Sequence, residues 1–401
     1  MSRDQPVAQA FHSFSTRRCT PAEAIQLMDL GRGECPVPYS HELGGFHIFR
    51  NYADVAAGMT DWRTYGSAPS VARPLPAVAP ESHPRTIAIH YDPPEHGKWR
   101  ALLVEGINPG VPDRIRSRVE ANVRARMEGI ADRGGGDLMH ELAVPVALDS
   151  ICEVIGFSAA DEEKARIVEL SQIFISRMRD SEDYVRKFTE LGDIGLAEID
   201  RRNGAVRDDF ISFIAGYTFD GCPLSRKQLN DTMATLFAAG HGTTANAIGG
   251  MLWDVLTRPH ILAALRADAG LIPNAIEESL RLHAPFFGLF RTARHDHEVH
   301  GVAIRNGESV MMAWQAANLD PARFDEPHEY RLDRPDYRHM TFGRGRHACV
   351  GAPTARMEME VVLRELLRRS ETFLLVEPHG DPFEFEGSES AGPRSLRVTI
   401  P

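Results

Sequence analysis

Residues 342–351 combine a cysteine with glycines in a pattern that could hold a metal or activate a nucleophile. They read FGRGRHACVG, so three glycines surround Cys349. Pro353 and the helical spacing of the apolar residues after it predict a helix that begins just beyond the cysteine. The dipole and free N–H groups at a helix N-terminus favour a thiolate. Cys349 is therefore predicted to be a metal ligand or a nucleophile, the alternative being a buried structural cysteine in a glycine-rich turn.

This pattern resembles the haem-binding loop of the cytochrome P-450 superfamily, Phe-Gly-x-Gly-x-His-x-Cys-x-Gly, and every fixed position is present. The resemblance implies haem b (iron protoporphyrin IX) as the cofactor and Cys349 as the axial thiolate on its iron. A thiolate ligand suits oxygen activation because it pushes electron density toward the O–O bond. The same resemblance assigns these further loop residues to the cofactor: Phe342, Gly343, Arg344, His347 and Gly351.

A second group of cations matches the family positions that hold the haem propionates. A predicted helix after a proline pair places His96 and Arg100 four residues apart on one face. They resemble the family's His-x-x-x-Arg clamp, and Arg291 and His347 fill its remaining positions. Buried carboxylates need such partners because leaving one unpaired costs several kcal/mol.

Glu278 and Arg281 form an i,i+3 pair on a helix predicted over residues 274–282. Such pairs usually lie on the surface. This one resembles the family's Glu-x-x-Arg pair, which implies a buried structural network that supports folding and haem retention. Glu329 stands where the family usually has a third, basic partner, so Arg334 is the candidate for that place.

The apolar segment 230–257 is predicted to form one buried central helix of about 40 Å. Gly240 and Gly242 would each cost ~0.5–1 kcal/mol in a helix interior, which indicates a groove or local unwinding where a ligand approaches. The stretch from Ala239 to Thr244 resembles the family's oxygen-binding pattern Ala-Gly-x-acid-Thr-Thr.

That resemblance places Ala239 against the cofactor and implies that Thr243 donates a hydrogen bond to bound O2. Gly242 replaces the acid that normally helps deliver protons. Water or a substrate group could substitute for that acid. His241 is a second candidate, although it lies about 200° round the helix from Thr243.

The predicted substrate pocket comes from regions that correspond to the family's substrate-contacting segments. These include the proline-rich loop 65–89 and the turn at residues 386–390. Most of the aromatic residues involved could equally belong to the core. Residues 240–242 and 392–396 resemble an aromatic O-demethylase branch, so we expect a small apolar or aromatic substrate. The predicted pocket residues are Leu236, Phe237, Ala239, Phe286, Phe287, Leu289 and Phe290.

Composition limits the remaining classes of protein. The 401 residues carry a net charge of −11, which argues against a general nucleic-acid binder. No apolar run is long enough for a transmembrane helix, and the N-terminus lacks a secretory pattern, so a cytoplasmic protein is expected. Five scattered cysteines disfavour a disulfide framework or a structural zinc site.

The coarse pattern predicts a mainly α fold with small β-sheets, namely the cytochrome P-450 fold. We expect one large domain over residues 1–401 with a buried haem, and a loosely ordered start within residues 1–36. Predicted strands lie at 44–50, 298–304, 309–312 and 396–400, and a helix at 52–60. Helices at 113–133 and 137–155 are separated by a break at Gly134–Gly136.

The resemblance implies a haem-thiolate monooxygenase that uses O2 for hydroxylation or O-demethylation. Its electrons would come from a separate ferredoxin or flavodoxin. Residues 338–369 hold seven arginines and three glutamates, which could steer an acidic donor or form a solvated helix face. The alternatives are a peroxide-driven oxygenase, a non-catalytic haem-binding sensor and a cysteine-nucleophile hydrolase. The last is disfavoured because His347 and Cys349 already belong to the haem pattern.

Overall fold

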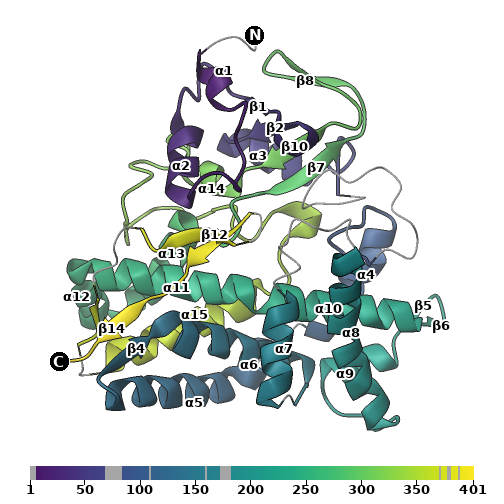
Figure 1. The fold of residues 1–401 in the computed structure, drawn as a ribbon, viewed down its shortest axis with the longest axis vertical. Helices are drawn as coiled ribbons and strands as arrows, with labels where there is room; N and C mark the ends of the chain where they lie inside the picture. Colours follow the sequence, from purple (N-terminus) through teal and green to yellow (C-terminus); the bar gives the residue numbers. More distant parts are fainter. Residues whose placement is uncertain are drawn as a thin grey trace.

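The computed structural model describes residues 6–67, 84–107, 110–158, 160–171, 182–369, 372–376, 381–386 and 389–401. Helices make up most of this part of the chain (Figure 1). The helices are α1 Pro6–Ala10, α2 Pro21–Asp29, α3 Tyr52–Thr60, α4 Glu95–Ile107, α5 Val111–Asp132, α6 Val144–Ile155, α7 Asp161–Ser171, α8 Glu182–Arg202, α9 Phe210–Ala215, α10 Arg226–Gly240, α11 Gly242–Thr257, α12 Pro259–Ala267, α13 Ile272–Leu282, α14 Trp314–Asn318 and α15 Ala352–Arg368.

The strands are short and belong to several small sheets, as predicted. They are β1 Tyr39–Ser40, β2 Phe46–Phe49, β3 Tyr65–Gly66, β4 Gly135–Asp137, β5 Thr218–Phe219, β6 Cys222–Pro223, β7 Leu289–Ala293, β8 His297–Val299, β9 Val302–Ile304, β10 Ser309–Met312, β11 Leu374–Leu375, β12 Phe383–Glu386, β13 Ser390–Pro393 and β14 Arg397–Thr399. The largest sheet has the order β1-β2-β10-β7-β3, with β2 and β10 parallel and the other pairs antiparallel. Figure 1 shows this sheet beside the N-terminal helices, while α11 and α15 cross the helical part of the molecule.

The prediction of one continuous central helix over residues 230–257 is wrong. The segment forms α10 and α11, which are separated at His241, where φ is −119° and ψ is −48°. α10 also begins earlier, at Arg226, because Ser225 and Gln228 form a capping box there. The break falls between Gly240 and Gly242, where the sequence predicts local unwinding.

The glycine break at residues 134–136 is also a strand rather than a simple turn. Gly135 and Gly136 pair with Val398 and Thr399 of β14. Gly135 has a φ of +141°, and a Cβ there would lie 2.3 Å from the carbonyl oxygen of Val398, so a side chain cannot be accommodated. The following helix does not start at residue 137: a π turn over Met139–Ala143 precedes α6.

Buried apolar residues from α4 to α15 form one large cluster, in which the central helices α10 and α11 are enclosed. Gly240 lets α10 approach α6, because a Cβ at this position would lie 2.5 Å from Cγ1 of Ile151. None of the helices in the described part of the chain has the length and apolar character needed to cross a bilayer. Parts of two predicted loops, residues 68–83 and 387–388, and the chain start at residues 1–5 lie outside the described residues.

Candidate active site

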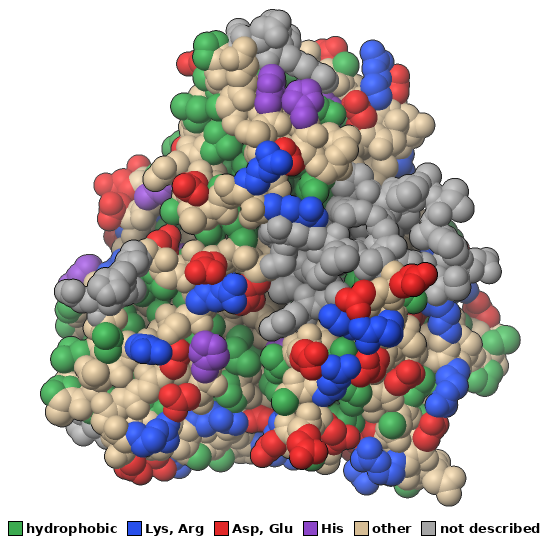
Figure 2. All heavy atoms as spheres, in the orientation of Figure 1, with side chains coloured by type: hydrophobic (Ala, Val, Ile, Leu, Met, Phe, Trp, Pro, Cys, Tyr) green, Lys and Arg blue, Asp and Glu red, His purple; other side chains and the backbone are tan. Residues whose placement is uncertain are grey.

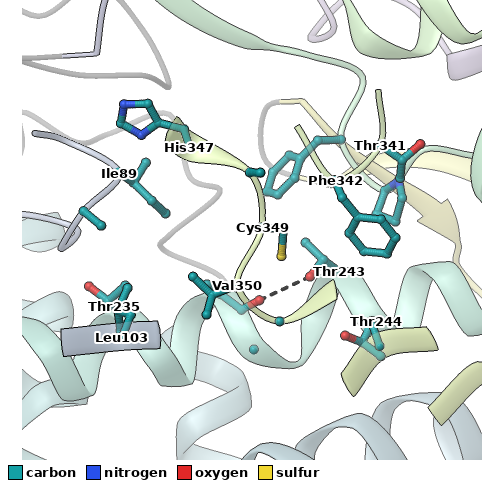
Figure 3. Close-up of a pocket in the computed structure, with 18 of the residues that line it drawn as sticks. Ile89, Leu103, Thr235, Thr243, Thr244, Thr341, Phe342, His347, Cys349 and Val350 are labelled. Atoms are coloured by element: carbon teal, nitrogen blue, oxygen red, sulfur yellow. Dashed lines mark hydrogen bonds between the residues drawn. The ribbon is translucent and has the colours of Figure 1, made fainter. Parts of the chain in front are cut away.

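A cavity of about 280 Å³ lies between α4, α10, α11, β7 and the start of α15. Figure 3 shows side chains from several of these elements pointing into it. Segments from residue 96 to residue 351 therefore meet at one place, although they are far apart in the sequence. The predicted site residues that line the cavity are His96, Arg100, Leu236, Ala239, Thr243, Phe286, Leu289, Arg291, Phe342, His347, Cys349 and Gly351.

Cys349 lies on a tight loop directly before α15. Gly343 and Gly345, each with a φ of +68°, turn the chain, and the Cys349 N–H donates to the Phe342 carbonyl at 2.7 Å. Burial raises the pKa of the Cys349 thiol, whereas the backbone N–H groups of Gly351 and Ala352 lower it. The Cys349 side chain faces the cavity and is exposed to that space. This arrangement suits a thiolate metal ligand, because coordination displaces the thiol proton.

Four cationic or protonatable side chains gather at another edge of the same cavity. The rings of His96 and His347 lie 4.3 Å apart, and Arg100 and Arg291 line the cavity beside them. Burial and the neighbouring positive charges lower the pKa of His347 to about 2. Burial also lowers the pKa of His96 and that of Arg100. It lowers the pKa of Arg291 to about 10. His96 and His347 are therefore neutral near pH 7, and Arg100 and Arg291 carry the positive charge of this cluster without an ion-pair partner among the described residues.

These residues fit a haem. The buried Nε2 of His96 has no hydrogen-bond partner in the described part of the chain, and the guanidinium of Arg291 donates only to the adjacent Phe290 carbonyl among the contacts found there. Two propionates would supply the missing negative charge and acceptors at this edge. Cys349 would hold the iron, and a Cβ at position 351 would lie 3.8 Å from its sulfur, which is an ordinary van der Waals contact. A bound haem would supply the iron centre at which O2 is reduced.

Thr243 lines the cavity from the first turn of α11, and its hydroxyl donates to the Ala239 carbonyl at 3.2 Å (Figure 3). Its two neighbours behave differently. His241 is buried away from the cavity and its Nδ1 is bonded to the Phe237 carbonyl at 2.9 Å, so the proposed relay role of this histidine is not supported. Gly242 does not line the cavity either, and a Cβ added there would meet nothing within 4 Å.

Glu278 and Arg281 are completely buried and form a network with Arg334. Arg281 donates from Nε and Nη2 to the two carboxylate oxygens at 2.8 Å each, and Arg334 Nε donates to the same oxygens at 2.8 and 3.0 Å. Other guanidinium donors of the two arginines reach backbone carbonyls, namely that of Asn318 at the end of α14 and that of Glu329. Glu329 thus contributes its backbone, while Arg334 occupies the third position beside Glu278.

Besides His241 and Gly242, five further residues predicted to contact the cofactor or the substrate do not line the cavity. In β7, side chains alternate, so Leu289 and Arg291 face the cavity while Phe290 packs against Phe46 with ring centroids 5.1 Å apart. Phe287 and Phe237 likewise belong to the core. In the cysteine loop, Gly343 shapes the turn, and Arg344 is exposed and reaches the Tyr52 hydroxyl at 3.3 Å.

Several cavity residues were not predicted. Trp314 enters from α14, and Glu358 and Glu389 bring two buried carboxyl groups to an otherwise mainly apolar wall. Glu358 carries a signal that could have been used, because it lies between Met357 and Met359 on the apolar face of α15. An acid among the buried residues of a helix is unusual unless it has a partner or a function.

A cysteine loop under a buried cavity, with cations at its rim and a broken helix across it, defines a haem-thiolate protein. The Cytochrome P450 family model matches residues 169–386, more than half of the chain. The chain is 31% identical over 369 residues to mycinamicin IV hydroxylase/epoxidase of Micromonospora griseorubida, covering 90% of each protein. It is 33% identical over 283 residues to 6-deoxyerythronolide B hydroxylase of Saccharopolyspora erythraea, covering 69% of each.

The solved structure of CYP108D1 from Novosphingobium aromaticivorans superposes with a TM-score of 0.83 at 25% identity, covering 98% of both chains. The chain therefore belongs to the cytochrome P450 family, has its mainly helical fold, and is a haem-dependent monooxygenase.

Proposed function

We propose that this P450 inserts one oxygen atom into a small apolar or aromatic substrate, by C–H hydroxylation or by O-demethylation. The observation that carries the proposal is the composition of the cavity beside Thr243. Residues from α4, α6, α10, α11 and the segment before β7 provide an almost entirely apolar wall, and polar groups are few. The apolar lining includes Leu103, Ile151, Val154, Leu236, Ala247, Phe286 and Leu289. Such a wall favours compact apolar molecules.

Hydroxylation is further supported by the relatives, because two of them are named as hydroxylases. O-demethylation would follow the same course, since hydroxylation of a methoxy carbon gives an unstable product that releases formaldehyde. Phe286, which faces Trp314 with ring centroids 6.5 Å apart, provides an aromatic surface for such a substrate.

Thr243 is proposed to orient O2 and hold a proton beside it. Its hydroxyl donates to Ala239 in the structure, and rotation about χ1 would release that donor toward the cavity. The proposed roles of His96, Arg100, Arg291 and His347 are to bind the two propionates, and that of Phe342 is to pack beside the cofactor. Glu278, Arg281 and Arg334 hold the segment before the cysteine loop in place.

Bacterial P450s receive electrons from redox partners, and we propose a separate ferredoxin or flavodoxin for this chain. The positive charge that residues 338–369 offer to such a partner is smaller than their seven arginines alone indicate. Arg338, Arg356, Arg364, Arg368 and Arg369 form ion pairs with acids such as Glu277 and Asp336. Arg344 and Arg346 are exposed and form no ion pair among the described residues, so they are the cations left to attract an acidic donor. Figure 2 shows acidic and basic side chains interspersed over the face in view.

A peroxide-driven reaction is the second candidate, and Gly242 is the observation that favours it. A peroxide supplies both oxygen atoms, two electrons and two protons at once, so it needs less proton delivery than O2 does. Product formation with hydrogen peroxide alone, compared with formation in the presence of ferredoxin, ferredoxin reductase and NADH, would distinguish the two. We expect the ferredoxin system to give the higher yield per haem.

The test of the substrate class is an optical titration of the ferric protein with methoxyaromatics, monoterpenes and fatty acids. A bound substrate displaces water from the iron and shifts the spectrum from low to high spin. We expect a saturable shift with small methoxyaromatics or monoterpenes and none with long fatty acids. A shift confined to fatty acids would contradict the proposed substrate class.

A further inference from the structure

Residues 85–92 form a short strap on one side of the active-site cavity. Ile87, Ala88 and Ile89 of the strap line the cavity, and the first two are buried. Figure 3 shows Ile89 and Thr235 among the side chains around the cavity. The position of the strap therefore limits the room that a ligand has on this side.

Helix α10 holds the strap at two points. The backbone N–H of Ile87 donates to the Thr235 hydroxyl at 3.1 Å. One turn earlier on α10, burial raises the pKa of the Asp231 carboxyl, while Lys227 and a hydrogen bond from the backbone N–H of Arg85 lower it. The two contacts fit together, because two residues of extended chain and four of helix each span roughly 6 Å. The strap therefore lies along α10 over one helical turn.

Thr235 lines the cavity, yet its hydroxyl is committed to the protein. It donates to the Asp231 carbonyl at 2.6 Å and accepts the Ile87 N–H. Thr235 is 4% exposed, and an N–H left without an acceptor in such a place is costly. These contacts make Thr235 a support for the strap rather than a hydrogen-bond donor offered to the substrate.

The strap contains a turn that needs this support. The Ile89 N–H donates to the Ile87 carbonyl at 2.7 Å, which closes a γ-turn, and Ala88 at its centre has a φ of +58°. Residues with a side chain rarely adopt this conformation, and it persists where the surroundings hold it in place. The far end of the strap is held as well, because the Asp92 carboxylate accepts the Ser67 N–H at 3.0 and 3.1 Å.

We propose that Thr235 is a positioning residue that sets the size limit of the substrate pocket. Its hydroxyl holds Ile87 against α10, and with it the γ-turn whose side chains form part of the cavity wall. Compact ligands bind with the strap in place, whereas a long chain has to displace it. The inference deepens the proposed function and rests on this cavity being the substrate site. Azoles that bind the iron measure the size of the pocket whatever the substrate is, so the two proposals can fail separately.

The first test compares two azoles that coordinate ferric haem iron, N-methylimidazole and N-dodecylimidazole. Optical titration of the holoprotein gives a dissociation constant for each. Thr235→Val removes the acceptor of the Ile87 N–H. We expect the constant for N-dodecylimidazole to fall by about tenfold, the equivalent of one hydrogen bond, while that for N-methylimidazole stays within about twofold. A ratio of the two constants that is the same in Thr235→Val and the wild type would overturn the proposal.

Two further variants separate this role from a general effect on structure or polarity. Thr235→Ser keeps the hydroxyl and should have the wild-type ratio of constants. Thr244→Val makes the same change of side chain at another residue that lines the cavity, one that forms no hydrogen bond with the strap among the described residues. Its ratio should also be that of the wild type. A shift as large in Thr244→Val as in Thr235→Val would contradict the assignment, because added apolar surface alone would then explain it.

Hydrogen exchange followed by mass spectrometry reads the strap itself. In Thr235→Val holoprotein, peptides that contain residues 86–90 should exchange at least about tenfold faster than in the wild type, while peptides from α15 keep their rate. If Thr235→Val fails to bind haem, the wild-type holoprotein decides the question. Bound N-dodecylimidazole should then speed exchange in residues 86–90, and N-methylimidazole should not. Equal exchange of the strap with the two azoles would overturn the proposal.

Discussion

The cysteine loop and the α10–α11 junction form opposite walls of one cavity, yet they differ in how closely they follow the family pattern. The loop around Cys349 matches at every fixed position, and two glycines with positive φ give it its shape. The junction lacks the usual acid, at Gly242, and breaks at His241. Metal coordination requires one atom at one place, whereas a proton can reach the oxygen site from more than one direction. The cysteine loop therefore requires particular residues at fixed positions. The α10–α11 junction can vary in sequence as long as protons still reach the oxygen site.

The largest effect is expected from the loop itself. Cys349→Ala removes the sulfur that would hold the iron. We expect monooxygenase turnover to fall by at least about a thousandfold, because no other side chain can supply the thiolate that favours O–O cleavage. Product formation per folded protein is the measurement. Circular dichroism before addition of haem serves as the control for folding, and turnover within about tenfold of the wild type would contradict the assigned ligand.

The next effect concerns the scaffold behind the loop. Glu278→Gln leaves Arg281 and Arg334 buried without their carboxylate, which should lower the free energy of unfolding by about 3–5 kcal/mol. Urea unfolding of the holoprotein measures this change. Glu198→Gln breaks another buried ion pair, on α8 and far from the loop in sequence, so it should also destabilise the protein but should leave haem retention closer to the wild type. Equal haem loss in both variants would mean that the Glu278 network has no particular connection with the loop.

A smaller effect is expected at the junction. Thr243→Ala removes the hydroxyl beside Ala239, so electrons should flow while product formation decreases. We expect product per NADH to fall by about three- to tenfold and hydrogen peroxide to rise by a matching amount. The neighbouring Thr244→Ala is the control and should retain most of the coupling. Unchanged coupling in Thr243→Ala would remove this residue from the oxygen site.

The smallest effect is a pH dependence at the loop side. Two contacts from Arg356 at 2.6 and 2.8 Å, together with His339, lower the pKa of Glu277 to about 2, and Arg356 also lies 4.4 Å from the centre of the Phe342 ring. Because the folded pKa is below the unfolded value, the pair stabilises the protein above about pH 4.5 and this contribution is lost as the pH falls toward 2. After allowance for partial exposure, the loss is on the order of 1 kcal/mol.

Urea unfolding at pH 6 and at pH 3.5 measures how much the pair of Glu277 and Arg356 contributes to the free energy of unfolding. Glu277→Gln should be less stable than the wild type at pH 6 by that amount, and the difference should shrink at pH 3.5. A difference that stays constant with pH would show that the Glu277 carboxylate does not titrate with the transition.

Sequence reasoning reached furthest where chemistry demands particular residues at a fixed spacing. Cys349, His96 and Arg100 all line the cavity. Arg334 bonds to Glu278, as expected for the third partner. Sequence reasoning was less effective where side-chain packing determines which residues face the cavity. Leu289 and Arg291 face the cavity while Phe290 does not, and strand alternation could have indicated this once β7 was recognised.

Long-range contacts account for most of the remaining differences. Gly135 is part of a strand because β14, more than 250 residues later, pairs with it, and no local pattern carries that information. The orientation of His241 likewise depends on where α10 ends and how its side chain bonds to its own helix.

The central claim is that Cys349 anchors the haem in this cavity, and X-ray absorption at the iron edge tests it most directly. The ferric wild-type holoprotein should show one sulfur atom among the iron ligands, and Cys349→Ala, reconstituted in the same way, should show none. A wild-type spectrum with only nitrogen and oxygen ligands, or a sulfur ligand that persists in Cys349→Ala, would contradict the account.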